Sequence, residues 1–251
     1  MSAVRRNILI TGASSGLGEG MARLYAAQGR NLALCARRED RLEALATELR
    51  QQHPDITVVV HTLDVNDHDA VFRVFDEADS ELGGLDRVIA NAGLGKGQPI
   101  GTGRFDANRQ TAETNFIALL AQCEAAMTLF RGRNAGHLVV VASVASVRGA
   151  RGNITTYAAS KAAAAHLAEG IRLDVMNTPI KVTTLMPGYI ESEMTAKSGK
   201  TPMLASADKG HRAMVSAIEK EPAEAFVPWW PWTAMATVMR FAPLPLLRKF
   251  G

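Results

Sequence analysis

A tyrosine and a lysine, Tyr157 and Lys161, are four positions apart in a segment whose pattern predicts a helix. Residues at this spacing lie on one helix face, about 6 Å apart along the axis. A tyrosine titrates near pH ~10, so it acts as a base at neutral pH only when a positive charge stabilises the phenolate. Lowering its pKa by about 3 units needs roughly 4 kcal/mol, and a lysine about 5 Å away supplies roughly 3 kcal/mol. The pair predicts an acid–base site, although chance alone also produces this spacing.

Two further polar residues are candidates for the same site. Ser143 ends an apolar run that predicts a strand, fourteen positions before Tyr157. Its hydroxyl can donate a hydrogen bond to a substrate oxygen that gains negative charge. Asn115 lies in a predicted helix, where its amide would either hold a water beside Lys161 or simply bond to backbone. Together the four residues predict proton transfer to or from a carbonyl or alcohol oxygen.

The elements that must position these residues alternate along the chain. Nearly all-apolar runs predict strands at 7–11, 31–36, 57–61, 87–91, 137–143, 181–186 and near 225–228. Helical periods predict helices at 18–28, 39–51, 67–82, 106–131 and 156–177. The alternation predicts one α/β domain, a doubly wound parallel sheet (Rossmann fold) with helices on both faces. We expect this domain to span residues 1–228, with a substrate loop at about 189–210 and a Trp/Pro-rich tail at 229–251.

The first predicted strand runs directly into a glycine-rich turn before a helix. Glycines in such a turn let backbone N–H groups approach the phosphates of a dinucleotide, although glycine also serves ordinary turns. The predicted phosphate-binding residues are Gly12, Ser14, Ser15, Gly16, Leu17 and Gly18. The ends of the third and fourth strands predict further cofactor contacts: Asp64 and Val65 at the adenine, then Asn91, Ala92 and Gly93.

The end of the second strand predicts which dinucleotide is bound. NAD-binding relatives of this fold carry an acidic residue there, which hydrogen-bonds the ribose 2′-hydroxyl. Here the position is Ala36, followed by Arg37 and Arg38. An arginine fork can hold a 2′-phosphate, which favours NADP(H). The alternative is that the two arginines only form a solvated helix start.

In order and spacing, these motifs resemble the short-chain dehydrogenase/reductase family over about residues 7–193. The motifs are Thr11-Gly12-x-x-x-Gly16-x-Gly18, Asn91-Ala92-Gly93, Asn115, Ser143, Tyr157-x-x-x-Lys161 and Pro187-Gly188. The resemblance implies that Tyr157 is the catalytic acid/base and Ser143 orients the substrate carbonyl. It implies that Lys161 lowers the tyrosine pKa and binds the nicotinamide ribose, and that Asn115 relays protons.

The resemblance also extends to the cofactor and the assembly. Arginine at the position of Arg37 marks NADP(H)-preferring members of the family. The segment after Pro187 and Gly188 is similar to the one that contacts the nicotinamide, which implicates Ile190 and Ser192. Ser192 stands where a threonine is usual, and the hydroxyl is kept. Family members assemble through the helices at 106–131 and 156–177, so we expect a homodimer or homotetramer.

Composition narrows the class of protein further. The chain has 251 residues, a net charge of +3 and scattered basic residues, so we expect no nucleic-acid partner. Its two cysteines, Cys35 and Cys123, lie in apolar surroundings that predict buried thiols. The histidine and cysteine spacing predicts no metal site. The first strand begins within a few residues of the N-terminus, so we expect no signal peptide and a cytoplasmic location.

Substrate and tail are less constrained by the pattern. Apolar residues in the loops predicted to wall the pocket favour a lipophilic carbonyl or alcohol, although such residues also fill gaps: Leu94, Ile100, Met194, Met203 and Leu204. The tail holds all three tryptophans, with Arg248 and Lys249 at its end. It is expected to be a lid, a subunit contact or a peripheral membrane contact. A catalytically weak NADP(H)-binding sensor and a membrane-associated scaffold are the alternative functions.

Overall fold

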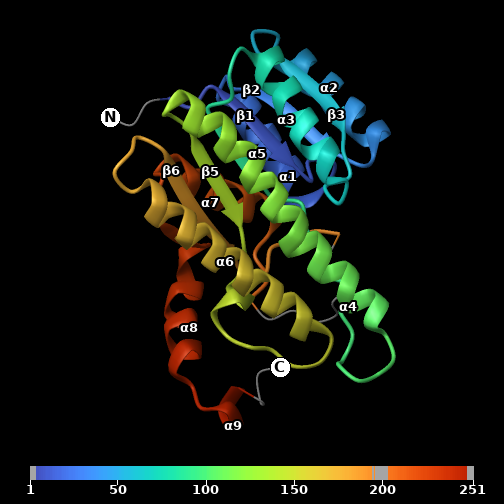
Figure 1. Cartoon of the computed structure of the whole chain (residues 1–251), viewed down its shortest axis with the longest axis vertical. Helices are drawn as coiled ribbons and strands as arrows, with labels where there is room; N and C mark the ends of the chain where they lie inside the picture. The colour runs from blue at the N-terminus through green and yellow to red at the C-terminus, as the bar shows by residue number, and fades with distance from the viewer. Residues whose placement is uncertain (1–3, 194, 196–202, 248–251) are drawn as a thin grey trace.

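The computed structural model describes residues 4–193, 195 and 203–247, and it is built on one parallel sheet (Figure 1). The sheet has seven strands in the order β3-β2-β1-β4-β5-β6-β7. The strands are β1 (Asn7–Thr11), β2 (Asn31–Ala36), β3 (Val58–Thr62), β4 (Arg87–Ala90), β5 (His137–Val141), β6 (Lys181–Pro187) and β7 (Glu224–Val227). Every neighbouring pair is parallel. The predicted doubly wound α/β fold is confirmed.

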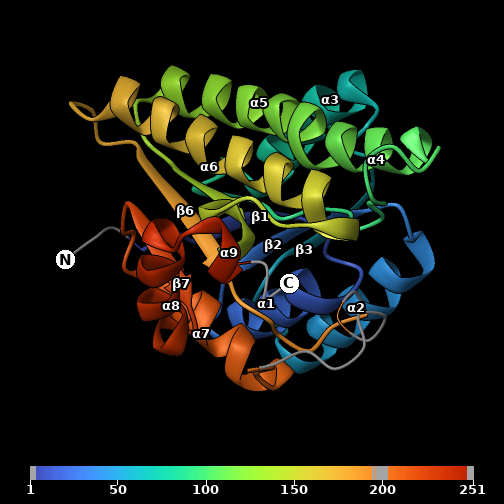
Figure 2. The same cartoon turned by 90° about the horizontal axis from the view of Figure 1, so that it is seen from below.

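Helices cover both faces of the sheet, and each face has its own core (Figure 2). One layer contains α3 (His68–Leu82), α5 (Ala118–Arg133) and α6 (Thr155–Val175). The other contains α1 (Gly16–Ala27), α2 (Glu39–Gln52) and α7 (Ala207–Glu219). Strand side chains alternate between the layers: Leu9 packs in the first core, while Ile8 and Ile10 pack in the second. This two-sided burial explains the nearly continuous apolar character of the strands.

Two thiols predicted to be buried lie in the first of these cores. Cys35 and Cys123 are both free and almost fully inaccessible. Burial disfavours the charged thiolate and so raises the pKa of both groups, to about 12 for Cys123. The prediction of two buried thiols is confirmed.

The long helix predicted at 106–131 is not continuous, which is the main correction to the expected elements. The chain forms α4 (Phe105–Ala112), then a π-helix, η1 (Glu113–Ile117), and then α5. A π-turn inserts one extra residue per turn, a feature common at functional sites. Its position here decides where Asn115 points, as described below.

The chain beyond β7 is also more regular than its sequence indicates. Residues 229–241 form α8 (Trp229–Phe241), and α9 (Leu244–Leu247) follows. Figure 1 shows α8 running away from the helix layers towards the end of the molecule where α4 also lies. Within the described residues, no helix is long and apolar enough to cross a membrane.

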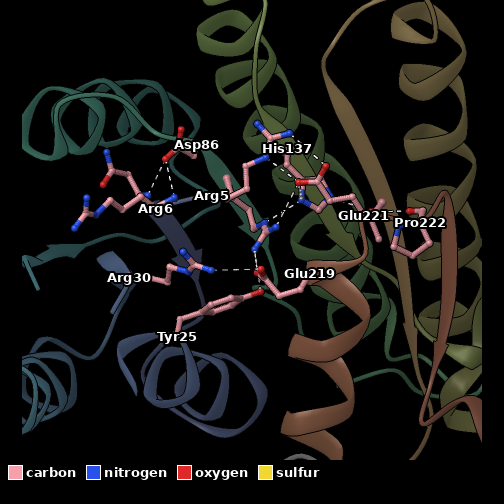
Figure 3. Close-up of polar contacts among 12 residues, drawn as sticks. Arg5, Arg6, Tyr25, Arg30, Asp86, His137, Glu219, Glu221 and Pro222 are labelled. Carbon is pink, nitrogen blue, oxygen red and sulfur yellow. Dashed lines mark hydrogen bonds and ion pairs between the residues drawn. The ribbon is translucent and has the colours of Figure 1, made fainter. Parts of the chain in front are cut away.

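At the amino ends of the strands, the structure holds a buried polar network (Figure 3). Its centre is Arg87 on β4, which is 1% exposed. The Arg87 guanidinium donates to His137 Nδ1 (2.9 Å) and the Tyr25 hydroxyl (3.3 Å). It also pairs with Glu219, the last residue of α7, and, at 3.5 Å, with Glu221, which follows the helix. These bonds tie the starts of β4 and β5 to the segment that leads into β7.

Two further arginines complete this network from other strands. Arg5, ahead of β1, donates to Glu221 Oε1 at 2.8 Å, and Arg30, ahead of β2, lies 3.6 Å from Glu219. Burial and the neighbouring Arg87 lower the pKa of His137, so its ring stays neutral. His137 Nε2 then lies 2.9 Å from the Thr183 hydroxyl on β6. The amino edge is thus held by charges that have opposite charges as partners.

Candidate active site

A cleft of about 2180 Å³ opens at the carboxyl ends of the strands. It lies where the strand order reverses, between β1 and β4, which is the usual position for a ligand in an open α/β sheet. Almost all of the predicted site residues line it: Gly12, Ser14, Ser15, Gly16, Leu17, Arg37, Arg38, Asp64, Val65, Asn91, Ala92, Gly93, Ser143, Tyr157, Lys161, Pro187, Gly188, Ile190 and Ser192. Gly18 and Asn115 lie behind this lining.

The glycine turn between β1 and α1 has a backbone that only glycine adopts easily. Gly12 and Gly16 have φ angles of +66° and +56°. A Cβ at Gly18 would lie 2.3 Å from the Gly12 carbonyl oxygen, so a side chain there would push the turn apart. Gly16 and Leu17, at the start of α1, line the cleft, and the free N–H groups of a helix start can bind a pyrophosphate. The residues present therefore fit a dinucleotide.

Asn91 and Thr11 lock this turn to the end of β4. The Asn91 side chain donates to the Thr11 carbonyl at 2.9 Å. The Thr11 hydroxyl accepts from the backbone N–H groups of Asn91 (3.0 Å) and Ala92 (3.1 Å). Sequence reasoning included Asn91 but gave Thr11 no separate role. Apart from its place in the glycine motif, nothing in the sequence indicates that Thr11 would bond the end of β4.

The two arginines after β2 have different surroundings. Arg38 lies across the glycine turn: Nε donates to the Ser14 hydroxyl (3.1 Å) and Nη2 to the Ser15 hydroxyl (2.5 Å). Arg37 is more exposed, and its closest acidic partner is Asp64, at 3.9 Å. Both line the cleft, but only Arg38 bonds the phosphate-binding turn. Glu193, which sequence reasoning did not single out, also bonds Arg38.

Three of the predicted catalytic side chains meet in the cleft beyond the glycine turn. Ser143 follows β5 and caps a short 3₁₀ helix, η2 (Val144–Val147), by accepting from the Ala145 N–H at 3.1 Å. Tyr157, on the first turn of α6, lines the same cleft as Ser143, and Ser143 acts to lower its pKa. Lys161, one turn later on α6, is buried and donates from Nζ to the Val141 carbonyl at 2.8 Å. The structure thus brings β5 and α6 together at one point.

The charge states of this group differ in one respect from the sequence-based expectation. Burial raises the pKa of Tyr157, the hydrogen bond from Ser143 opposes that rise, and the nearby phenol of Tyr189 adds to it. Burial also lowers the pKa of Lys161 to about 8. The net pKa of Tyr157 is therefore raised rather than lowered, because burial outweighs the hydrogen bond from Ser143. A neutral phenol next to a buried lysine is set up to donate a proton.

Asn115 contacts the site from behind, through the π-helix η1. Its amide nitrogen donates to the Leu94 carbonyl (2.8 Å) and the Ser160 hydroxyl (3.1 Å), and its oxygen accepts from the Leu94 N–H (2.7 Å). The side chain is 1% exposed. Of the two sequence-based alternatives, this geometry favours bonding to backbone. A Cβ at Gly93 would lie 3.4 Å from Asn115 Oδ1 and 3.5 Å from Lys161 Nζ, which are ordinary contact distances, so Gly93 lies next to both side chains.

Helix α8 forms part of the cleft wall, which the sequence left open among three readings of the tail. Trp232 is 3% exposed and meets the Tyr189 ring edge-on, with centroids 5.4 Å apart. A Cβ at Gly188 would lie only 2.0 Å from the Trp232 indole, so the tryptophan packs directly on that backbone. At the other end, Arg148 donates to the carbonyls of Arg240 (3.2 Å) and Ala242 (3.3 Å).

The apolar residues predicted to wall the pocket divide into three groups. Leu94 and Met203 line the cleft. Ile100 and Leu204 are exposed and do not line it. Met194 lies outside the described residues, as do Arg248 and Lys249 of the tail. Apolar residues that the prediction missed line the cleft from the tail instead: Met235, Val238, Met239, Leu244 and Leu247.

Comparison with known proteins agrees with this site and fold. Residues 6–203 match the family described as short chain dehydrogenase. An uncharacterised oxidoreductase of Mycobacterium tuberculosis (strain H37Rv) is 54% identical over 247 residues, 98% of each chain. The 11-beta-hydroxysteroid dehydrogenase 1A of Arabidopsis thaliana is 36% identical over 190 residues, 75% of this chain and 53% of that protein.

A solved structure is similar over nearly the whole chain. The alcohol dehydrogenase from the archaeon Thermococcus sibiricus, complexed with 5-hydroxy-NADP, has a TM-score of 0.78 and 26% sequence identity. The match covers 88% of this chain and 95% of that one. Fold and cleft define a nucleotide-binding oxidoreductase of small molecules. The chain belongs to the short-chain dehydrogenase/reductase family, whose members act on CH–OH or C=O groups with NAD(H) or NADP(H).

Proposed function

We propose that the chain is an NADP(H)-dependent reductase or dehydrogenase of a lipophilic carbonyl or secondary alcohol. The observation that carries the proposal is the meeting of Ser143, Tyr157 and Lys161 on one wall of the cleft. The wall lies beyond the glycine turn, so a nicotinamide bound there would supply or accept the hydride. A sensor without turnover would not need this group of side chains.

In the reducing direction, Ser143 donates a hydrogen bond to the substrate oxygen as negative charge develops on it. Tyr157 then gives its proton to that oxygen. The raised pKa of Tyr157 keeps the phenol protonated before the reaction, which suits a donor. Lys161 stabilises the phenolate that remains, because its ammonium lies on the same helix face. In the oxidising direction the phenolate is the base.

Preference for NADP(H) is proposed from the residues that follow β2. Ala36 offers no carboxylate to a ribose 2′-hydroxyl, while Arg37 and Arg38 both line the cleft. Of the two, Arg38 is in the better position, because it already bonds Ser14 and Ser15 of the glycine turn. Its guanidinium can hold a 2′-phosphate while keeping one of those contacts. The 5-hydroxy-NADP complex of the Thermococcus sibiricus enzyme is consistent with this proposal.

A lipophilic substrate is proposed from the apolar wall supplied by α8 and α9. Met235, Val238 and Met239 face the same cleft as Tyr157 and Ser143. Methionines adapt their shape to apolar ligands. The name of the Arabidopsis thaliana relative, a hydroxysteroid dehydrogenase, agrees with this class. In this proposal the tail is a pocket wall rather than a separate unit.

The geometry of the cleft does not bear on the proposed oligomeric state or location. A homodimer or homotetramer through α5 and α6 remains a prediction. Alanines of these helices such as Ala118 and Ala164 are already buried within the single chain, so they do not by themselves indicate a contact between subunits. Peripheral membrane contact through exposed Trp229, Trp230 and Phe241 remains a prediction as well, as does a cytoplasmic location.

The experiment that tests the proposed chemistry is Tyr157→Phe, assayed by NADPH absorbance with a ketone substrate. Removing a positioned proton donor costs typically 10²–10⁴-fold, so we expect turnover to fall by at least about 100-fold. The Kd for NADPH should change less than about 2-fold, because the ring and the glycine turn remain. A fully active Tyr157→Phe enzyme would end the proposal.

A further inference from the structure

A single acidic residue from the far side of the cleft binds the arginine proposed to select the coenzyme. Glu193 follows β6, and its two carboxylate oxygens have different partners. Oε2 accepts from Arg38 Nη1 at 3.1 Å, and Oε1 accepts from Arg41 Nη1 of α2 at 2.5 Å. The carboxylate therefore joins the loop after β6 to the start of α2 across the mouth of the nucleotide site.

Arg38 has no guanidinium nitrogen to spare in this arrangement. Nε and Nη2 bond the hydroxyls of Ser14 and Ser15, and Nη1 bonds Glu193. The neighbouring Ser192 lies close to the glycine turn, since a Cβ at Gly16 would be 3.3 Å from the Ser192 Cβ. A phosphate that binds Arg38 from the cleft therefore competes with these acceptors, although Nη1 and Nη2 each carry a second N–H. Glu193 is the one that carries a negative charge.

The Glu193 carboxylate and a phosphate group can compete for the same arginine. Carboxylate and phosphate oxygens accept from the same guanidinium N–H groups, often in bidentate pairs. Hydrogen bonds from Arg41 and Arg38 lower the pKa of Glu193, so the carboxylate is ionised at neutral pH. The side chain of Glu193 is 54% exposed. Ion pairs at this exposure are weak, so a phosphate can displace the carboxylate at a small cost.

We propose that Glu193 is a coenzyme-specificity residue, an internal competitor that occupies Arg38 and Arg41 where the 2′-phosphate of NADP(H) binds. This inference rests on the proposed NADP(H) preference and adds a residue that opposes it. A nucleotide with a 2′-phosphate competes with Glu193 for Arg38 and Arg41, and its charge is repelled by the nearby carboxylate. A nucleotide with a plain 2′-hydroxyl leaves those pairs intact. The cost therefore falls on NADP(H) alone.

The test measures nucleotide binding without turnover, on the full chain. Isothermal titration calorimetry gives the Kd of adenosine 2′,5′-bisphosphate and of adenosine 5′-monophosphate for the wild type and Glu193→Gln. We expect Glu193→Gln to bind the 2′,5′-bisphosphate about 3- to 5-fold more tightly, a size within the range of exposed ion pairs. Its Kd for the 5′-monophosphate should stay within about 2-fold of the wild-type value.

A matched control separates this pairing from general charge effects. Asp40→Asn removes one negative charge beside Arg41 on α2, and no hydrogen bond from Arg38 or Arg41 to Asp40 is among the described contacts. We expect it to change the Kd of the 2′,5′-bisphosphate by less than about 2-fold. An equal gain in both variants would overturn the role of Glu193, as would unchanged or weaker binding by Glu193→Gln.

Arg38→Ala distinguishes failure of this inference from failure of the coenzyme proposal. If Arg38→Ala weakens the 2′,5′-bisphosphate and Glu193→Gln does nothing, the coenzyme proposal stands and the Glu193 inference is wrong. If the wild type binds both nucleotides equally and Arg38→Ala changes neither, the NADP(H) preference is wrong and the inference is lost with it.

Discussion

The two edges of the sheet each bury a cation, and they treat it in opposite ways. At the amino edge, Arg87 is surrounded by Glu219 and Glu221. At the carboxyl edge, the Nζ of Lys161 donates to a neutral acceptor, the Val141 carbonyl. Burial therefore lowers the pKa of Lys161 to about 8. A buried charge with opposite charges around it holds structure, while one without them remains available for chemistry.

The same contrast explains why the two edges differ in openness. At the amino edge, Arg30 and Arg87 pair with Glu219 at the end of α7, and Arg5 pairs with Glu221 just after it. At the carboxyl edge, the strands end in a glycine turn and short loops, and the wall opposite is an appended helix, α8. The amino edge fixes the positions of the strands, and the site residues lie at the opposite ends of those strands, at the carboxyl edge.

The largest effect on stability is expected from Arg87→Leu at the amino edge. This change removes a partner from Glu219 and from Glu221, whose side chain is 7% exposed, and breaking a buried pair typically costs about 3–5 kcal/mol. For a chain of this size, that lowers Tm by roughly 10 °C in a thermal melt. The control is Arg73→Leu, since Arg73 forms an exposed pair with Glu77 and should cost less than about 1 kcal/mol. If Arg87→Leu lost no more stability than Arg73→Leu, the polar network around Arg87 would not stabilise the fold.

Lys161→Met should stabilise the fold at neutral pH, whereas Arg87→Leu destabilises it. The pKa of Lys161 in the folded chain, about 8, lies below its ordinary value of 10.5. Between these values the unfolded chain binds more protons, so this group makes the wild type more stable as pH rises from about 8 to 10.5. At pH ~7 the buried charge costs up to about 3 kcal/mol.

We therefore expect Lys161→Met to be more stable than the wild type at pH ~7, and the advantage to shrink by pH ~10. Urea unfolding at both pH values measures this difference, while turnover with NADPH should fall sharply. An advantage that is absent, or that grows with pH, would mean that Lys161 is not a strained cation.

A smaller effect, on substrate binding, is expected from Trp232→Ala at the α8 wall. Loss of the indole removes the support of Tyr189 and opens the pocket. We expect KM for a bulky ketone to rise about tenfold, equivalent to ~1.4 kcal/mol, and KM for a small ketone to rise less. Trp229→Ala is the matched control, because Trp229 is 73% exposed and should change KM by less than about 2-fold. Equal changes in the two variants would remove α8 from the pocket wall.

The sequence predicts much of this arrangement because the parallel sheet has a strong local signature. Apolar runs and the glycine turn place β1 to β6, and the ends of those strands bring Ser143, Asn91 and Gly12 to one edge. The spacing of Tyr157 and Lys161 follows from the geometry of one helix. These features depend on neighbours in sequence or on a common fold.

Other features depend on contacts between segments that are distant in sequence, and local sequence patterns do not predict them. The π-helix η1 turns Asn115 towards Leu94, which a helical period cannot indicate. The pairing of Glu193 with Arg38 joins residues 155 positions apart. The docking of Trp232 on Gly188 depends on how α8 leaves β7. The pKa of Tyr157 follows from burial, which outweighs the effect expected from the Lys161 spacing.

The most direct test of the carboxyl edge as a reductase site is one assay. The wild-type chain is mixed with a panel of ketones of increasing size and lipophilicity, with NADPH and NADH side by side, and coenzyme absorbance is followed. We predict ketone-dependent oxidation of NADPH, with kcat/KM at least about tenfold higher than with NADH, a difference of ~1.4 kcal/mol. Failure to oxidise either coenzyme across the panel, by protein that binds NADPH, would contradict the proposed catalytic function. A preference for NADH would contradict the role assigned to Arg38.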